Sequence, residues 1–223
     1  MSRLKLAAVL LSSALFAQDN SDFLHQTDVV NKMKKNFGLI NTYTARFKLT
    51  MKEDKKTKLY RGIVYYERGG KIHYDFQSPS RDKIISDGKT MWVYIQRLNA
   101  VGIQKLSNKK TSLPPAQLEG LISLFERYHY RFDDPQQPKK VNGKPFYVLE
   151  LKEKVSSGGY QNLTVYVNPE SYFIEKIIGK RGTSKRVELE LSSVKTNTSL
   201  KSGLFIFKVK DGVKVVENPL TIN

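Results

Sequence analysis

Few side chains in this chain have the types and spacings that catalysis requires. The sequence contains three histidines and no cysteine. None of the histidines lies in a His-Glu-x-x-His pattern or at another metal-ligand spacing. We therefore interpret His25 as a surface residue, His73 as a strand-end residue and His129 as a loop-end residue. The absence of cysteine excludes disulfides, thiolate metal sites and a cysteine nucleophile.

Gly88-Lys89-Thr90 and two aspartates are the other candidates for polar chemistry. The tripeptide matches the end of a phosphate-binding loop, but Lys83 stands where that motif needs its first glycine, and a strand is expected to follow rather than a helix. Asp82 and Asp87 each lie beside a predicted turn, where aspartate commonly bonds the backbone. No Gly-x-Ser-x-Gly nucleophile motif is present. We therefore predict that the protein is not an enzyme and uses no metal or cofactor.

Hydrophobic periodicity predicts one helix near the N-terminus, followed by many short strands. Val29, Val30, Met33 and Phe37 recur at helical spacing over residues 22–37, and Gly38 can end that helix. Strand-like segments then follow at short spacing without crossover helices, which favours an antiparallel sheet. With about ten strands, the sheet must curl. No linker rich in proline, glycine or serine divides the chain, so we predict one domain over residues 18–223.

A second helix is predicted over residues 114–128, where Leu118, Leu121, Ile122 and Phe125 form one apolar stripe. The stretch 74–94 carries the only tryptophan and is expected to form three short strands, two of them joined at the hairpin signal Asp87-Gly88. Residues 204–207 are predicted to form a short strand.

Large apolar residues are abundant on the predicted strands, and two interpretations of them are open. In a flat sheet they form an ordinary core, whereas in a strongly curled sheet they line a cavity between the sheet and the helices. Periodicity does not separate these alternatives. The residues concerned are Phe47, Leu49, Tyr65, Tyr74, Phe76, Trp92, Tyr94, Tyr147, Leu149, Tyr166, Phe173, Phe205 and Phe207.

The first 17 residues have the organisation of a secretory signal peptide. Arg3 and Lys5 precede the apolar run 6–11, and Ala17 is a small residue before a polar stretch. The apolar run is short for a membrane span, which needs roughly 20 residues. We therefore expect export and cleavage near Ala17.

The formal net charge is +17, and the basic residues are spread along the chain. This charge is compatible with a solvated basic surface. It is also compatible with docking to anionic lipid headgroups or to an acidic protein face. Nucleic acid is disfavoured because no nucleic-acid-binding module is recognisable.

The segments Phe76-x-Ser78-Pro79 and Ile84-Ile85-Ser86-Asp87-Gly88-Lys89-Thr90-x-Trp92-x-Tyr94 resemble the signature region of the periplasmic outer-membrane lipoprotein carrier family of the LolA type. The order of parts is similar as well: signal peptide, helix, hairpin, signature region, central helix, further strands and a Phe-x-Phe near the C-terminus. The resemblance covers about residues 22–218.

This resemblance implies an α+β fold, in which a strongly curled antiparallel sheet forms a half-open β-barrel and helices form a lid over an apolar cavity. It implies a monomeric periplasmic carrier that takes acylated lipoproteins from an inner-membrane ABC-type release complex to an outer-membrane acceptor. Arg68 matches the family's lid arginine, although Gly69 replaces the proline that follows it. Residues 208–213 replace the family's proline-rich C-terminal segment.

The ligand-binding residues expected from the sequence and the resemblance are Arg68, Phe47, Leu49, Tyr74, Phe76, Trp92, Tyr94, Leu118, Leu121, Ile122 and Phe125. Two alternatives to a lipoprotein carrier stay open. One is a LolA-like domain that carries or senses another lipid or a glycolipid. The other is an exported structural β domain without a ligand.

Overall fold

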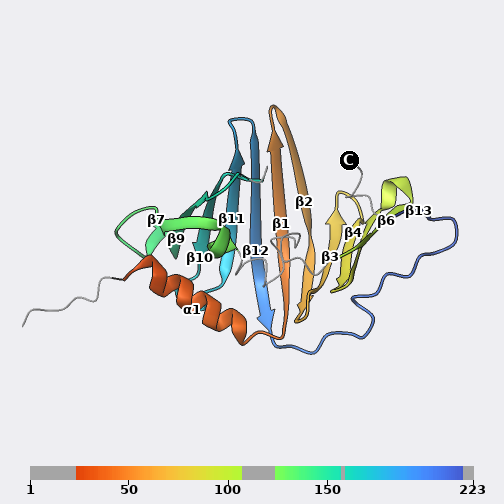
Figure 1. The fold of residues 1–223 in the computed structure, drawn as a ribbon, viewed down its shortest axis with the longest axis horizontal. Helices are drawn as coiled ribbons and strands as arrows, with labels where there is room; N and C mark the ends of the chain where they lie inside the picture. The colour runs from red at the N-terminus through yellow and green to blue at the C-terminus, as the bar shows by residue number, and fades with distance from the viewer. Residues whose placement is uncertain (1–23, 107–123, 157–158, 218–223) are drawn as a thin grey trace, which may run out of the picture.

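The computed structural model describes residues 24–106, 124–156 and 159–217, which form one long sheet with few helical segments (Figure 1). The predicted signal peptide, residues 1–17, lies outside these ranges. Leu118, Leu121 and Ile122 of the predicted central helix lie outside them as well.

Strands dominate the described chain. In order they are β1 (Thr42–Glu53), β2 (Lys56–Glu67), β3 (Lys71–Ser78), β4 (Lys83–Asp87), β5 (Thr90–Ile95), β6 (Ala100–Lys105), β7 (Tyr128–Phe132), β8 (Lys139–Val141), β9 (Lys144–Glu153), β10 (Asn162–Val167), β11 (Ile174–Arg181), β12 (Lys185–Thr196) and β13 (Lys214–Glu217). The helical segments are α1 (Gln26–Gly38), the short 3₁₀ helix η1 (Gln96–Leu98) and residues 124–127.

Helix α1 confirms the first predicted helix. Its residues Val29, Val30, Met33 and Phe37 are buried on one stripe, as the spacing predicts. Burial of each such side chain contributes about 1.5–3 kcal/mol. At the start of the helix, the backbone N–H of His25 donates to a carboxylate oxygen of Asp28 at 3.1 Å, which satisfies a polar group at the helix N-terminus.

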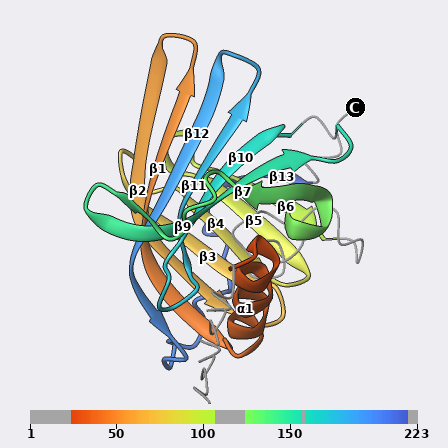
Figure 2. The same ribbon diagram turned by 90° about the vertical axis from the view of Figure 1, so that its left-hand side faces the viewer.

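The sheet is open, because its two edge strands, β13 and β7, do not pair with each other (Figure 2). The order across it is β13-β6-β5-β4-β3-β2-β1-β12-β11-β10-β9-β7, with β8 paired to β9. Every pairing in the described chain is antiparallel except that of β13 with β6. The predicted antiparallel sheet is therefore confirmed, with one parallel strand added at its edge.

One face of the sheet carries the main buried cluster. Directly opposed residues of neighbouring strands share a face, so Tyr43 lies with Tyr66, and Ala45 with Val64. We call this side the inner face, because its buried residues pack in one cluster with α1. The main buried members from the sheet are Tyr43, Ala45, Phe47, Val64, Tyr66, Ile72, Tyr147, Leu149, Leu151, Leu163, Val165 and Ile177.

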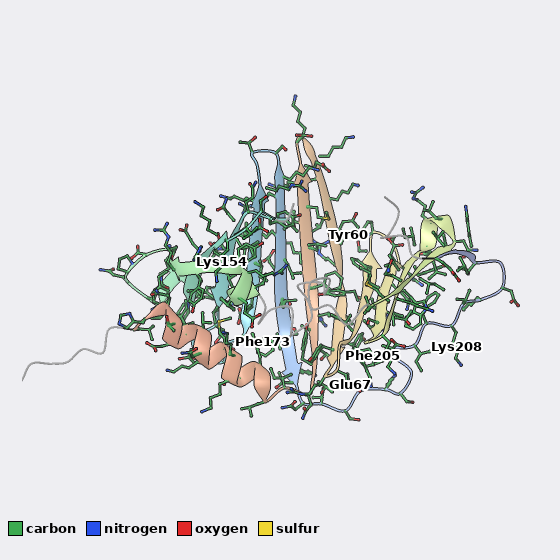
Figure 3. The ribbon with its side chains drawn as sticks, viewed as in Figure 1. Tyr60, Glu67, Lys154, Phe173, Phe205 and Lys208 are labelled. Carbon is green, nitrogen blue, oxygen red and sulfur yellow. The ribbon has the colours of Figure 1, made fainter. Side chains whose placement is uncertain are left out.

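The segment between β12 and β13 corrects the prediction of a strand over residues 204–207. A turn occurs there instead, and Gly203 adopts a φ of +83° that favours glycine. Phe205 is buried, and Phe207 packs against Tyr94 with ring centroids 5.6 Å apart. Phe205 lies toward the opposite end of the sheet from Phe173, which packs near α1 (Figure 3). The edge strand comes later, at β13.

Candidate functional site

Three aromatic rings form the centre of the candidate site on the inner face. The Phe47 ring meets Tyr74 and Phe76 edge to face, with centroids 5.3 Å and 5.1 Å apart. Phe76 in turn meets Tyr60 at 5.9 Å. Edge-to-face pairs are favourable because the positive edge of one ring meets the negative face of the other.

Gly62 makes this arrangement possible. It is directly opposite Phe47 on β2, and a Cβ at this position would lie 2.8 Å from two atoms of the Phe47 ring. The missing side chain therefore provides the space into which the ring packs.

The candidate site combines buried and accessible apolar surface. Phe47 is 3% exposed, whereas Leu49, Tyr74 and Phe76 are only partly buried and pack against the same cluster. Desolvation by the surrounding side chains, together with nearby Tyr43, raises the pKa of the Tyr74 hydroxyl well above its ordinary value. The structure thus brings four of the predicted residues together, while their ligand-binding role stays a prediction.

The structure does not bring Trp92 and Tyr94 to this site. Tyr74 is opposite Ile84, and Ile84 is opposite Val93, so Val93 is the β5 residue on the inner face. Because side chains alternate along a strand, Trp92 and Tyr94 lie on the other side, which we call the outer face. Both residues thus lie on the opposite side of the sheet from the aromatic cluster, and their ligand-binding role stays a prediction.

Phe125 is the one described member of the predicted helical stripe. It is 4% exposed, belongs to the same buried cluster as α1, and meets Tyr130 edge to face at 5.5 Å. The helical residues end at 127, and Tyr128 already begins β7. We did not predict β7, because its first residues continue the apolar spacing of the helix before them.

Arg68 ties the end of α1 to the end of β2. Its guanidinium donates to the carbonyl oxygens of Gly38 at 2.6 Å and Ile40 at 2.8 Å, and to the side-chain oxygen of Asn41 at 3.0 Å. The last carbonyls of a helix lack intrahelical donors and carry partial negative charge, so a cation is favourable there. The contact is compatible with the family resemblance, which assigns Arg68 to the lid, and that role stays a prediction.

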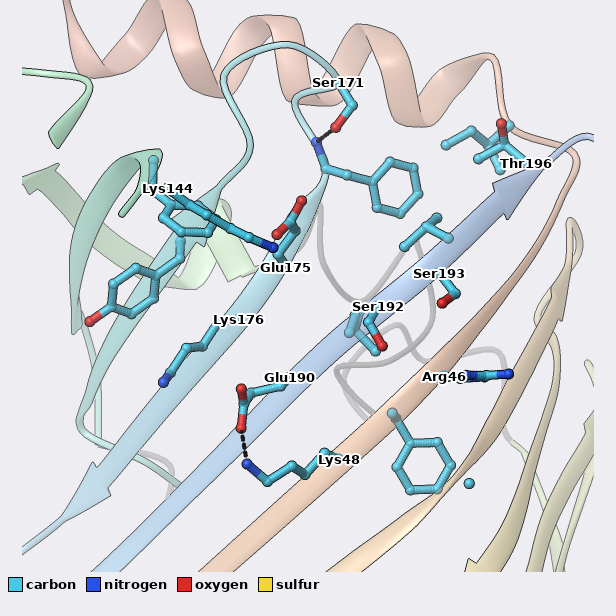
Figure 4. Close-up of a pocket in the computed structure, with 18 of the residues that line it drawn as sticks. Arg46, Lys48, Lys144, Ser171, Glu175, Lys176, Glu190, Ser192, Ser193 and Thr196 are labelled. Atoms are coloured by element: carbon cyan, nitrogen blue, oxygen red, sulfur yellow. Dashed lines mark hydrogen bonds and ion pairs between the residues drawn. The ribbon is translucent and has the colours of Figure 1, made fainter. Parts of the chain in front are cut away.

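A pocket of about 1180 Å³ is lined by charged as well as apolar side chains, whereas we expected an apolar cavity (Figure 4). Arg46, Phe47 and Lys48, three consecutive residues of β1, all border it, so the strand backbone forms part of its wall. The charged members lie on the outer face, because Phe47 lies on the inner one.

His73 is a feature that sequence reasoning missed, since we expected an ordinary strand-end residue. It is 6% exposed, and neither ring nitrogen has a hydrogen-bond partner among the described residues. The ring lies 5.7 Å from that of Tyr65. Burial, followed by the charge of Lys83, lowers the pKa of His73, against smaller opposing effects of Asp75 and the Leu204 backbone.

The lowered pKa of His73 predicts a loss of stability in mild acid. The neutral ring has its full stabilising effect above the unfolded-state pKa, near 6.5. That effect is lost as the pH falls toward the lower folded-state value, because the unfolded chain binds the proton first. We expect His73→Phe to reduce the drop in the free energy of unfolding between pH 7.5 and pH 5. Urea titrations followed by Trp92 fluorescence measure this drop.

His129→Gln is the matched control for this measurement, since His129 is exposed. It should leave the pH dependence as in the wild type. Equal pH dependence of all three proteins would contradict the assignment to His73.

The described residues show neither a metal site nor a membrane helix. No group of three or more histidines, aspartates and glutamates among them could hold a metal ion. No helix among them has the length and apolar character to cross a bilayer.

The fold and the inner face define a class of protein: an open, mainly antiparallel sheet with one apolar aromatic face and a helix packed on it. A solved structure with the same fold is an uncharacterized conserved protein from Thermus thermophilus, with a TM-score of 0.56 at 12% identity, covering 86% of this chain and 98% of that one.

The family model described as outer membrane lipoprotein carrier protein LolA matches residues 38–208. The chain belongs to this family, as the signature region predicts. The chain is 26% identical to an outer-membrane lipoprotein carrier protein of Hahella chejuensis (strain KCTC 2396), covering 97% of this chain and 98% of that protein. It is 25% identical to one from Coxiella burnetii (strain CbuK_Q154), covering 97% of this chain and all of that protein.

Proposed function

We propose that the protein is a periplasmic carrier that binds the acyl chains of lipoproteins and transfers them from the inner to the outer membrane. The observation that supports this most directly is the partly accessible aromatic wall of Phe47, Tyr74 and Phe76 on an open sheet. Family membership and the names of the relatives point the same way. A carrier of this kind needs no catalytic group.

Acyl chains suit such a wall energetically. Each CH₂ removed from water contributes about 0.8 kcal/mol, so a single chain supplies roughly 10 kcal/mol. A rigid apolar cavity would hold such a ligand too tightly to release it. Helices that cover the empty inner face lower the net affinity, because the ligand must displace them.

In this proposal α1 is one of the lid helices, and Arg68 is its latch. The helix buries its apolar stripe in the inner-face cluster, and the Arg68 guanidinium donates to the carbonyl of Gly38, its last residue, and to that of Ile40 just beyond it. The proposed partners are an inner-membrane ABC-type release complex and an outer-membrane acceptor. Export through the signal peptide at residues 1–17 places the carrier between them.

Binding of a fluorescent fatty acid to residues 18–223 tests the proposal. Leu49 lies on the inner face beside the aromatic wall, while Thr50 is its neighbour on the other side of β1. We expect Leu49→Gln to weaken probe binding about tenfold, which corresponds to about 1.4 kcal/mol of lost apolar contact. Thr50→Gln should bind the probe like the wild type.

A wild-type protein that binds neither the fatty acid nor a triacylated lipopeptide would overturn the proposal. Equal loss in the two variants would place the ligand away from the inner face. Mass spectrometry of lipid co-purified with the protein distinguishes lipoprotein from another lipid or a glycolipid.

A further inference from the structure

Three cations gather in the pocket on the outer face of β1 and β2. Arg46 and Lys48 are two residues apart on β1, and Arg61 is directly opposite Lys48 on β2. Only Lys48 has a carboxylate partner, Glu190 at 2.8 Å. Arg46 and Arg61 make no ion pair or side-chain hydrogen bond within the described chain. Like charges directly opposite each other destabilise a sheet, and Glu190 compensates only one of these three cations.

The rest of the lining does not neutralise these cations. The described residues around the pocket include five basic side chains and two acidic ones, a surplus of three positive charges. Glu190 is engaged by Lys48, and Glu175 accepts a hydrogen bond from Asn168 at 2.9 Å. The basic Lys176 is itself paired with Glu188 at 2.5 Å. Arg46, Arg61 and Lys144 are therefore the lining cations without a carboxylate partner among the described residues, against one carboxylate without a cation partner there, Glu175.

The geometry suits an extended chain. Alternate residues of a strand are about 6.6–6.8 Å apart, since each residue rises 3.3–3.4 Å. Arg46 and Arg61 lie diagonally across β1 and β2, since Arg61 is opposite Lys48, and such diagonal neighbours are roughly 7–8 Å apart in a sheet. This separation is close to the spacing of acidic side chains at alternate positions of an extended peptide. A guanidinium binds a carboxylate through two parallel hydrogen bonds, which adds directional contacts from Arg46 and Arg61.

The far wall supplies an apolar contact. Phe146 and Tyr166 line the pocket and meet edge to face at 5.9 Å, and Lys144, two residues before Phe146 on β9, lines it as well. An aromatic pair beside a row of cations fits a peptide that carries an apolar residue next to its acidic ones. A flat membrane surface fits less well, because the cations line a concave pocket with protein on several sides.

We propose that this pocket binds an extended acidic segment of a partner protein, with Arg46 and Arg61 pairing its carboxylates. The proposal does not depend on the acyl-carrier function, since it uses the opposite face of β1. Loss of one binding activity would leave the other intact, so the two proposals fail separately.

Fluorescence anisotropy of a labelled peptide with glutamates at alternate positions and one phenylalanine tests the site in residues 18–223. We expect the double variant R46Q/R61Q to bind at least tenfold more weakly than the wild type. The double variant K55Q/K58Q is the matched control, because it removes the same charge from exposed positions at the tip of the same hairpin. A peptide with glutamine in place of glutamate should bind weakly to all proteins.

Three outcomes would overturn the proposal. The first is an equal loss in the two double variants, which would indicate only the general charge of the protein. The second is that the wild type binds phosphatidylglycerol vesicles strongly and that R46Q/R61Q abolishes this vesicle binding but leaves peptide binding unchanged. That result would indicate a site for a lipid headgroup. The third is that the wild type does not bind the peptide although its cooperative unfolding in urea shows that it is folded.

Discussion

Gly62→Ala is expected to lower the free energy of unfolding by about 3 kcal/mol, at the upper end of the range for overpacked cores. The added Cβ would lie 2.1 Å from the backbone oxygen of Asp75 and 2.8 Å from the Phe47 ring. A backbone oxygen cannot rotate away as a side chain can, so β2 and β3 must separate. The pairing of β2 with β3 also shifts register next to this residue, between Arg61 and Gly62.

Urea unfolding measures this effect, and Gly38→Ala is its control. Gly38 ends α1, has no neighbour within 4 Å of its Cβ position and has no positive φ. Alanine should therefore be neutral or stabilising by up to about 1 kcal/mol there, as in other helices. The packing of Phe47 over Gly62 would be refuted if the two alanine variants had the same stability as the wild type.

Arg68→Met should cost about 1–2 kcal/mol of unfolding free energy and loosen the end of α1. The substitution removes three hydrogen bonds from a charged donor, one to the last carbonyl of α1 and two to the segment just after the helix. Hydrogen bonds to charged groups contribute about 1.5–3 kcal/mol, and the exposure of Arg68 reduces that value through competition with water. Hydrogen exchange should rise in the last turn of α1. Under the carrier proposal, the same variant should also accept the acyl probe faster.

Two further variants distinguish the effect of the Arg68 hydrogen bonds at the end of α1 from the effect of removing a positive charge. Arg97→Met removes an equal charge from an exposed residue that makes no hydrogen bond through its side chain within the described chain, so it should change stability by less than about 0.5 kcal/mol. Arg68→Lys keeps the charge but lacks the planar fork, and should recover only part of the loss. Similar exchange rates for Arg68→Met and Arg97→Met would show that Arg68 does not hold the helix.

The local elements of this fold could be predicted, because their signals lie within a few residues. The stripe of Val29, Val30, Met33 and Phe37 specifies α1. Alternation along residues 43–51 specifies β1, and the hairpin signal Asp87-Gly88 lies between β4 and β5 as expected. The short strands β7, β8 and β13 were missed, because each depends on a neighbouring strand for its hydrogen bonds.

The assignment of apolar residues to a face required the tertiary structure. Alternation shows that Trp92 and Val93 point to opposite sides, but both are apolar, and only the pairing of β4 with β5 decides which side meets Tyr74. Burial of His73 also required the tertiary structure. Its neighbours include Lys83 on the adjacent strand and the backbone of Leu204, which is distant in sequence.

The sequence by itself determined the family, the apolar surplus on the strands and the strong positive charge. Each of these depends on residue type, order and short-range spacing. Only the tertiary structure decided that Phe47, Tyr74 and Phe76 share one wall, that Arg68 holds the end of α1, and that Arg46 and Arg61 share a pocket. These contacts arise from strand register and sheet curvature, which are set by many weak interactions between distant segments.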